Sequence, residues 1–326
     1  MGKKKLEEKI RDASAMLNRC RVEIAKRVVG QKQMIDGMLM GLLAGGHVLI
    51  EGVPGLAKTL AVRTLAEVID ADFKRIQFTP DLLPADLIGT MIYRQPTGEF
   101  IPRKGPIFSN IVLADEINRA PAKVQSALLE AMEERQVTIG NDTFKLDSPF
   151  FVLATQNPIE HEGTYPLPEA QLDRFLLKLK VEYPNFDEEL DILRLAGSGK
   201  EKDVDRVMKK EDINSLKELV GEIKIEPSIN EYIVSIVSAT RGIGVKKAEF
   251  IRYIEFGASP RASIYLHRCS KIRALFDGRE FVIPEDVKAV AHDVLRHRIV
   301  LNYEAESDGV IPENIINSIL NYVQVP

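Results

Sequence analysis

The first part of the chain alternates between short, continuously apolar runs and longer segments whose apolar residues recur at helical spacing. Five apolar runs predict β-strands, at 47–51, 73–78, 110–116, 150–157 and 175–183. Two of the segments between them predict helices, at 58–70 and 122–134. Apolar strands separated by helices predict a parallel sheet covered on both faces, so we expect an α/β fold with ligands at the carboxyl ends of the strands.

Two helices and two hairpins are predicted around this sheet. Helical spacing predicts a helix at 6–27 and a second within 28–46, which a pair of glycines ends. Turn residues between short strand-like runs predict β-hairpins at 91–103, with QPTGE at the tip, and at 137–146, with GND at the tip. Both hairpins interrupt the strand–helix alternation, so we expect them as inserts.

After residue 183 the pattern becomes helical. Six segments have helical spacing, at 186–196, 211–221, 228–240, 260–277, 284–297 and 312–323. A proline lies at or near the start of most of them, where its missing N–H is tolerated. The stretch 197–205 reads as an exposed loop. We therefore predict two domains, 1–184 with the sheet and hairpins, and 185–326 as a smaller, all-helical domain.

Composition and charge limit the kinds of partner and the cellular compartment that we expect. The chain carries 44 lysines and arginines against 48 aspartates and glutamates, so its net charge of −4 does not favour a nucleic-acid partner. With only two cysteines in 326 residues, we expect no disulfides and a reducing compartment. No apolar run approaches the roughly 18 residues of a membrane span, and the N-terminus lacks the apolar core of a signal peptide. We therefore expect a cytoplasmic protein without a membrane span.

The stretch after the first strand, GVPGLAKT at 52–59, has the features of a phosphate-binding loop. Such a loop must point backbone N–H groups at a phosphate chain, and Gly52 and Gly55 give the backbone that freedom. Lys58 opens the next helix, where its ammonium can reach phosphate oxygens, and the Thr59 hydroxyl can ligate Mg²⁺.

One position departs from the standard pattern GxxxxGK[ST], because Ala57 stands where the pattern has glycine. An alanine can adopt the right-handed helical conformation that we expect at a helix start, so the exchange does not exclude phosphate binding. The alternative is a glycine-rich turn with a surface lysine. The strand–loop–helix context favours the phosphate site.

Polar residues end two of the other predicted strands. Asp115 and Glu116 end IVLADE, and Asn157 ends FFVLATQN. At the carboxyl edge of the sheet, Asp115 could hold Mg²⁺, Glu116 could polarise an attacking water, and Asn157 could orient that water or touch the γ-phosphate. A solvated strand end and an Asn-Pro turn are the alternatives. The position of the acids after a phosphate loop favours a nucleotide site.

Five motifs together resemble the MoxR family of AAA+ ATPases: GVPGLAKT, ADEINRA, ATQNP, LPEAQLDRF and GASPRA. The resemblance covers the chain from about residue 10 to residue 323, and alanine before the lysine is usual in that family. It implies an AAA+ αβα domain with a parallel five-stranded sheet, followed by a helical lid. ATP and Mg²⁺ would bind between them, at the interfaces of a hexameric ring.

The resemblance also implies roles for individual residues. The Walker A segment, which binds the phosphates, comprises Gly52, Val53, Pro54, Gly55, Leu56, Ala57, Lys58, Thr59 and Leu60. The adenine-lining segment includes Val29, Gly30 and Gln31, and the implied metal ligands are Thr59 and Asp115. The implied catalytic residues are Glu116 of Walker B, Asn157 as sensor 1, Arg174 as the arginine finger toward a neighbouring subunit, and Arg261 as sensor 2.

Taken without the resemblance, the two arginines have plainer alternatives. Arg174 follows Asp173, so a structural ion pair is its alternative role, and an exposed pair contributes only about 0–1 kcal/mol. Arg261 follows Pro260 at a predicted helix start, where the helix dipole favours anions. A bound phosphate would explain a cation there, and an ordinary surface arginine is the alternative.

The family resemblance implies a chaperone-like motor that remodels, matures or activates protein complexes, often with a partner that carries a von Willebrand factor A domain. The alternative is a DNA-dependent motor or helicase loader, which requires basic and aromatic hairpin tips. The tips QPTGE and GND are uncharged or acidic, and so favour a protein client. A third reading, a nucleotide-gated binding module that hydrolyses poorly, is disfavoured by Glu116 and Asn157.

Overall fold

The computed structural model describes residues 2–96, 98–158, 163–197, 202–245 and 248–326, with the backbone alone at residues 2 and 3. Thr97 of the first predicted tip and residues 198–201 of the predicted loop lie outside the described residues. The chain divides into two compact units, which we call the sheet unit (Arg19–Pro168 with Leu179–Ile213) and the helical unit (Met1–Asn18, Glu169–Lys178 and Asn214–Pro326). The domain boundary near residue 184 stays a prediction.

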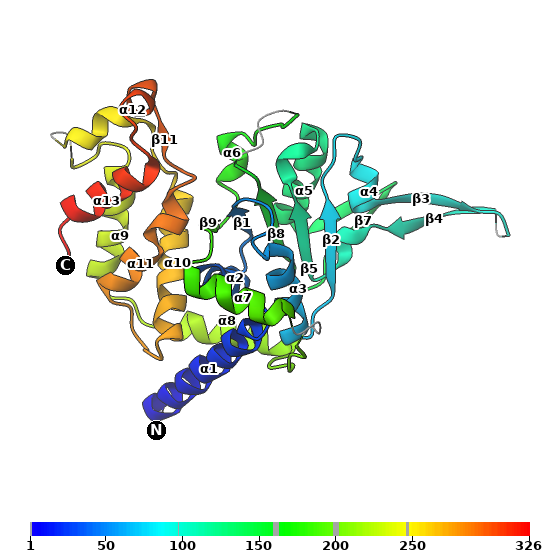
Figure 1. The fold of residues 1–326 in the computed structure, drawn as a ribbon, viewed down its shortest axis with the longest axis horizontal. Coiled ribbons are helices and arrows are strands. Elements are labelled where there is room, and N and C mark those ends of the chain that lie inside the picture. The colour runs from blue at the N-terminus through cyan, green and yellow to red at the C-terminus, as the bar shows by residue number, and fades with distance from the viewer. Residues whose placement is uncertain (1, 97, 159–162, 198–201, 246–247) are drawn as a thin grey trace. The chain divides into compact units, whose positions relative to one another are not determined.

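A five-stranded sheet in the order β2–β5–β8–β1–β9 is the centre of the α/β architecture (Figure 1). Its strands are β1 (Val48–Glu51), β2 (Phe73–Gln77), β5 (Ile111–Asp115), β8 (Phe151–Gln156) and β9 (Leu177–Lys180). The pairs β2–β5, β5–β8 and β1–β8 are parallel. Because β5 is buried along its whole length, its sequence is apolar up to the final aspartate. The predicted sheet is confirmed.

Several helices of the sheet unit accompany these strands. They include α2 (Lys32–Ala44), α3 (Lys58–Val68), α4 (Pro84–Ile88), α5 (Ala122–Glu134) and α7 (Phe186–Gly197), while α1 (Gly2–Ala25) and α8 (Lys210–Glu222) contribute residues to both units. At Gly41 of α2, a β-carbon would lie 2.5 Å from Cγ2 of Val48, so glycine lets this helix approach β1 closely. Gly45, with φ 66°, ends α2 as predicted.

Both predicted hairpins are present. Strands β3 (Gly89–Arg94) and β4 (Glu99–Lys104) form one, and β6 (Gln136–Ile139) and β7 (Asp142–Lys145) form the other. The β3–β4 hairpin extends away from the five-stranded sheet (Figure 1). Its arms carry the exposed rings of Tyr93 and Phe100, whose centroids lie 5.3 Å apart. The prediction considered the turn residues alone and so missed this aromatic pair.

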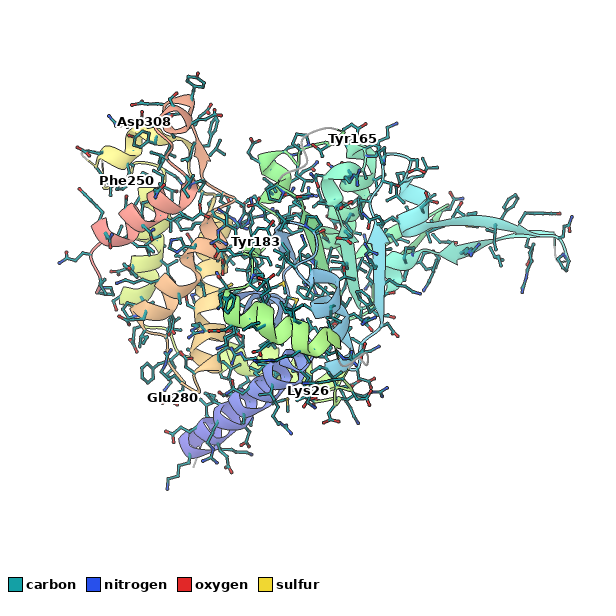
Figure 2. The ribbon with its side chains drawn as sticks, viewed as in Figure 1. Lys26, Tyr165, Tyr183, Phe250, Glu280 and Asp308 are labelled. Carbon is teal, nitrogen blue, oxygen red and sulfur yellow. The ribbon has the colours of Figure 1, made fainter. Side chains whose placement is uncertain are left out.

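The helical unit is built mainly from helices that begin at proline. Its helices are α6 (Glu169–Leu172), α9 (Pro227–Ala239), α10 (Pro260–Phe276), α11 (Pro284–Leu295), α12 (Tyr303–Ser307) and α13 (Pro312–Tyr322). The ring of Phe250, labelled in Figure 2, packs edge-on against Tyr322 of α13, with centroids 6.1 Å apart. A short antiparallel pair, β10 (Ile254–Phe256) with β11 (Val300–Leu301), adds to the predicted helices. Strands this short leave no periodicity to detect.

Candidate active site

The loop between β1 and α3 holds the first group of predicted site residues. Gly55 has a φ of 88°, a conformation that glycine adopts without steric cost. At Gly52 a β-carbon would lie 2.9 Å from the carbonyl oxygen of Val181, so this position requires glycine because two backbone segments meet there. The Gly52 N–H donates to the carbonyl oxygen of Gln156 at 3.2 Å, which ties the start of the loop to β8.

Ala57 differs from its predicted conformation. Its backbone is left-handed, with φ 56° and ψ 19°, rather than right-handed helical. The prediction was wrong because α3 begins at Lys58, and Ala57 is the residue before it, where the loop turns. Glycine adopts this conformation without the roughly 1–2 kcal/mol that a β-carbon costs, which explains the glycine of the standard pattern.

Lys58 turns its ammonium back into the loop, where Nζ donates to the carbonyl oxygen of Gly52. Burial lowers the pKa of this ammonium, and the nearby carboxylates of Asp115 and Glu116 act in the opposite direction. One cavity of about 400 Å³ is lined by Pro54, Gly55, Leu56, Ala57, Lys58, Thr59, Leu60, Arg75, Asp115, Glu116, Thr155 and Asn157. The structure thus brings the phosphate loop, both predicted acids and Asn157 together.

Asp115 is buried at the end of β5 and is held on both carboxylate oxygens. Oδ1 accepts a hydrogen bond from the Thr155 hydroxyl at 2.6 Å. Oδ2 accepts from Arg75 Nε at 2.8 Å and from Arg75 Nη2 at 2.6 Å. An arginine side chain and a hydroxyl therefore hold the Asp115 carboxylate in place.

Neither partner of Asp115 was predicted, although strand register carries the signal. Gln77 pairs with Asp115 across β2 and β5, and Arg75 lies two residues earlier, on the same face of β2. Ala154 pairs with Ala114 across β8 and β5, so the next residues, Thr155 and Asp115, lie side by side. The order of strands in the sheet is needed for this deduction, and it is not apparent from one sequence.

Glu116 projects from a turn directly after β5. Its backbone is left-handed, with φ 56° and ψ 52°, an uncommon conformation for a residue with a β-carbon. Its N–H donates to Oγ1 of Thr155 at 2.8 Å, and its Oε2 accepts from Gln77 Nε2 at 2.7 Å and from Arg119 Nη1 at 3.1 Å. Thr155 therefore fixes both acids, and Gln77 and Arg119 orient the Glu116 carboxylate.

A buried glutamine supports the segment that follows Glu116. Gln125 of α5 donates from Nε2 to the carbonyl oxygens of Ile117, Ala120 and Tyr165, at 3.2, 3.1 and 2.9 Å. Tyr165, labelled in Figure 2, also donates its N–H to the carbonyl oxygen of Asn118 at 2.6 Å. These hydrogen bonds hold the segment that follows Glu116 in place. Nothing in the local sequence pattern indicated this role for Gln125.

A second cavity, of about 520 Å³, adjoins the first and shares with it three loop residues and one residue of α3. Besides these shared residues, Gly55, Leu56, Ala57 and Leu60, its lining includes Val29, Gln31, Pro184, Ile192 and Leu195. Gln31 is left-handed, with φ 52°, and its side chain donates to the carbonyl oxygen of Glu182 at 3.1 Å. The apolar side chains of this cavity suit a planar base.

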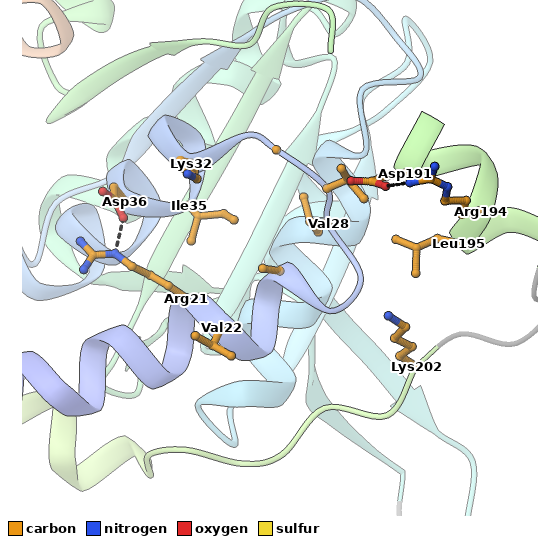
Figure 3. Close-up of a pocket in the computed structure, with 13 residues that line it drawn as sticks. Arg21, Val22, Val28, Lys32, Ile35, Asp36, Asp191, Arg194, Leu195 and Lys202 are labelled. Carbon is orange, nitrogen blue, oxygen red and sulfur yellow. Dashed lines mark hydrogen bonds and ion pairs between the residues drawn. The ribbon is translucent and has the colours of Figure 1, made fainter. Parts of the chain in front are cut away.

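A third cavity, of about 670 Å³, lies between the ends of α1 and α2 and helix α7 (Figure 3). It shares Val29, Leu195 and Lys202 with the second cavity, and the predicted Gly30 belongs to its lining. Two ion pairs lie at its margin, Arg21 Nε with Asp36 Oδ1 at 2.5 Å and Arg194 Nη1 with Asp191 Oδ1 at 2.7 Å (Figure 3). Val29 thus lines both cavities, and Gly30 lines the third cavity only.

The two predicted arginines belong to the helical unit. Arg174 follows α6, and Arg261 lies in the first turn of α10; both side chains are half-buried. A short link joins their segments, because the Ser259 hydroxyl donates to Oδ2 of Asp173 at 2.9 Å and also caps α10 by accepting from the N–H of Arg261 at 3.2 Å. Asp173, the residue before Arg174, forms an ion pair with Arg298, whose Nε lies 2.8 Å from Oδ1 of the aspartate.

Comparison with known proteins agrees with this geometry. A family model described as "ATPase family associated with various cellular activities (AAA)" matches residues 47–177, and an AAA lid model matches residues 251–319. The chain is 50% identical over 313 residues to Chaperone MoxR1 of Mycobacterium tuberculosis, covering 95% of this chain and 82% of that protein. This chain belongs to the MoxR family of AAA+ ATPases.

Two further comparisons agree. The chain is 32% identical over 337 residues to Protein MoxR of Methylorubrum extorquens, covering 97% of this chain and 96% of that protein. A crystal structure of a predicted ATPase from Cytophaga hutchinsonii is 50% identical and superposes with a TM-score of 0.91, covering 100% of this chain and 99% of the other. Within the described residues, no helix is long and apolar enough to cross a membrane.

Proposed function

We propose that this MoxR-family protein binds ATP together with Mg²⁺ and hydrolyses it. The observation that carries the proposal is the single cavity that joins the phosphate loop to Asp115, Glu116 and Asn157. In this proposal the loop N–H groups and Lys58 hold the β- and γ-phosphates, and the adjoining apolar cavity takes the adenine. Leu56, Leu60, Ile192 and Leu195 would contact the base.

The donor set of the cavity fits Mg²⁺. Thr59 offers a hydroxyl and Asp115 a carboxylate, the hard oxygen ligands that this ion takes. Magnesium keeps several waters and is usually held by one or two protein oxygens plus phosphates. When bound, the ion would neutralise charge on the phosphates.

Glu116 is the proposed water activator. Its backbone is left-handed where the chain leaves β5, and Gln77 and Arg119 hold one of its carboxylate oxygens. A carboxylate so oriented can accept a proton from an attacking water. Asn157, buried on the same cavity, is proposed to orient that water or contact the γ-phosphate.

The wider role that we propose is that of a chaperone-like motor in a hexameric ring. Arg174 would reach the γ-phosphate of a neighbouring subunit, and Arg261 would contact nucleotide from the helical unit. The hairpins would engage a protein client, alone or through a partner with a von Willebrand factor A domain. The exposed Tyr93 and Phe100 support such a contact, because aromatic side chains anchor protein interfaces.

The replacement Glu116→Gln tests hydrolysis directly. We expect ATP affinity within about twofold of wild type and turnover at least about 100-fold slower, because an amide cannot accept the proton. Glu130→Gln, on an exposed position of α5, is the matched control and should retain turnover. Wild-type turnover in Glu116→Gln would remove the proposed water activator; lost ATP affinity would instead indicate damage to the site.

A further inference from the structure

Three consecutive residues after α11 point their side chains at the backbone of one other segment. Arg296, His297 and Arg298 are all buried, with 9%, 6% and 5% of their surface exposed. Arg296 Nη1 donates to the carbonyl oxygen of Lys178 at 2.7 Å, and His297 Nε2 lies 3.1 Å from that of Phe175. Both segments belong to the helical unit. We call this group the clamp.

Arg298 makes the largest number of these contacts. Its Nε lies 2.8 Å from Oδ1 of Asp173, and Nη2 donates to the carbonyl oxygen of Asp173 at 3.0 Å. It also donates to the carbonyl oxygens of Phe175, Leu176 and Val294. These contacts flank Arg174 on both sides, at residue 173 and at residues 175 and 176.

The side chain of Arg298 is itself fixed in place by an aromatic ring and by several hydrogen-bond acceptors. Its guanidinium carbon lies 4.9 Å from the ring centroid of Tyr265 in α10, at cation–π distance. Burying a cation without partners is costly, and the Asp173 carboxylate and four carbonyl oxygens offset that cost. A planar guanidinium can serve several acceptors at once, which a lysine ammonium on its flexible stem cannot reproduce.

We infer that Arg298 is a positioning residue for hydrolysis: it fixes the backbone around Arg174, so that this arginine is held ready for the γ-phosphate. The inference rests on the proposed role of Arg174. A buried arginine that served stability alone could be satisfied by any carboxylate. Here its donors contact Asp173 and Phe175, the two residues next to Arg174, and the carbonyl oxygens of Leu176 and Val294. Ser259 extends the same network to the cap of α10, which carries Arg261.

The test compares Arg298→Lys with Arg174→Ala and with the double variant. If Arg298 acts through Arg174, Arg298→Lys should lower kcat by about 100-fold, the typical cost of misplacing a catalytic group, with ATP affinity within about twofold of wild type. The double variant should be no slower than Arg174→Ala alone, because both changes remove one function.

Arg279→Lys is the matched control. This arginine of the helical unit forms a comparable ion pair with buried Asp286, at 2.5 Å, but lies outside the clamp. It should lower stability without lowering kcat, and its effect should add to that of Arg174→Ala. If Arg298→Lys does not fold, Asp173→Asn, which weakens the same pair while sparing the carbonyl contacts, should slow kcat in the same direction.

Three outcomes distinguish a failure of this inference from a failure of the proposed role of Arg174. Slow turnover in Arg174→Ala with wild-type turnover in Arg298→Lys overturns the inference and leaves the role of Arg174 intact. Losses that multiply in the double variant also overturn it. Wild-type turnover in Arg174→Ala removes the proposed finger, and with it any positioning role for Arg298.

Discussion

At the scale of single residues, Ala57 has a backbone conformation that is unfavourable for a residue with a β-carbon. Its left-handed backbone costs about 1–2 kcal/mol relative to glycine. Glycine in turn lowers the free energy of unfolding by about 0.4–1 kcal/mol, because it raises the conformational entropy of the unfolded chain. Ala57→Gly should therefore raise the free energy of unfolding by about 0–1.6 kcal/mol and keep ATP binding. Ala61→Gly, within α3, should lower that free energy by about 1 kcal/mol. Equal losses in both variants, measured by urea unfolding, would contradict this account.

Lys58 carries the affinity for the phosphates in the proposal. Lys58→Ala should weaken ATP binding by about 1.5–3 kcal/mol, roughly 10- to 150-fold, because a charge-assisted hydrogen bond is lost. Isothermal titration calorimetry measures this. Lys32→Ala, at an exposed lysine on the margin of the third cavity, should bind ATP as wild type does. Near-normal binding in Lys58→Ala would overturn the phosphate-loop assignment.

His297 gives a pH dependence with a definite sign. Burial lowers its pKa well below the usual 6.5, so the native state keeps the imidazole neutral while the unfolded state protonates. Its contribution to stability is complete above about pH 6.5 and is lost as the pH falls toward the lowered pKa. His297→Gln should reduce the slope of unfolding free energy against pH below 6.5 by up to about 1.4 kcal/mol per pH unit. An unchanged slope would mean that His297 titrates alike in both states.

At the scale of elements, the sequence predicted the parts that periodicity can show. Continuous apolar runs marked the buried strands, and prolines marked the first turns of α9, α10, α11 and α13. Motif spacing marked the loop and both acids. Arg75, Gln77 and Thr155 were missed because they join the site through strand register, and the clamp was missed because its contacts span more than 110 residues of chain.

The β3–β4 hairpin should matter to a client and not to the chemistry. Tyr93 and Phe100 are 57% and 66% exposed, so replacing both with serine removes a potential contact without disturbing a core. Basal hydrolysis should stay within about twofold of wild type, while stimulation by, or action on, a protein client should fall. A collapse of basal hydrolysis with the fold intact by circular dichroism would place the hairpin in the active site.

At the scale of the whole molecule, the proposed role of Arg174 requires active sites that are shared between neighbouring subunits. Each site would take its phosphate loop, Asp115 and Glu116 from one sheet unit, and Arg174 from the helical unit of a neighbour. Head-to-tail contacts of this kind close into rings. Arg174→Ala and Glu116→Gln would then each be inactive for different reasons, one lacking the donated arginine and the other lacking its own water activator.

Mixing these two inactive variants is the most direct test of this claim. In an equal mixture, about a quarter of head-to-tail interfaces pair an intact Glu116 with an Arg174 donated by the neighbour, from one half times one half. Under conditions in which subunits exchange, shown by energy transfer between labelled chains, ATPase activity should return to a fraction of the wild-type rate. The control is a ring of wild-type subunits into which one Glu116→Gln subunit has exchanged, and it should keep most of its activity. If that control is active and the mixture of the two variants stays inactive, the active site is not shared.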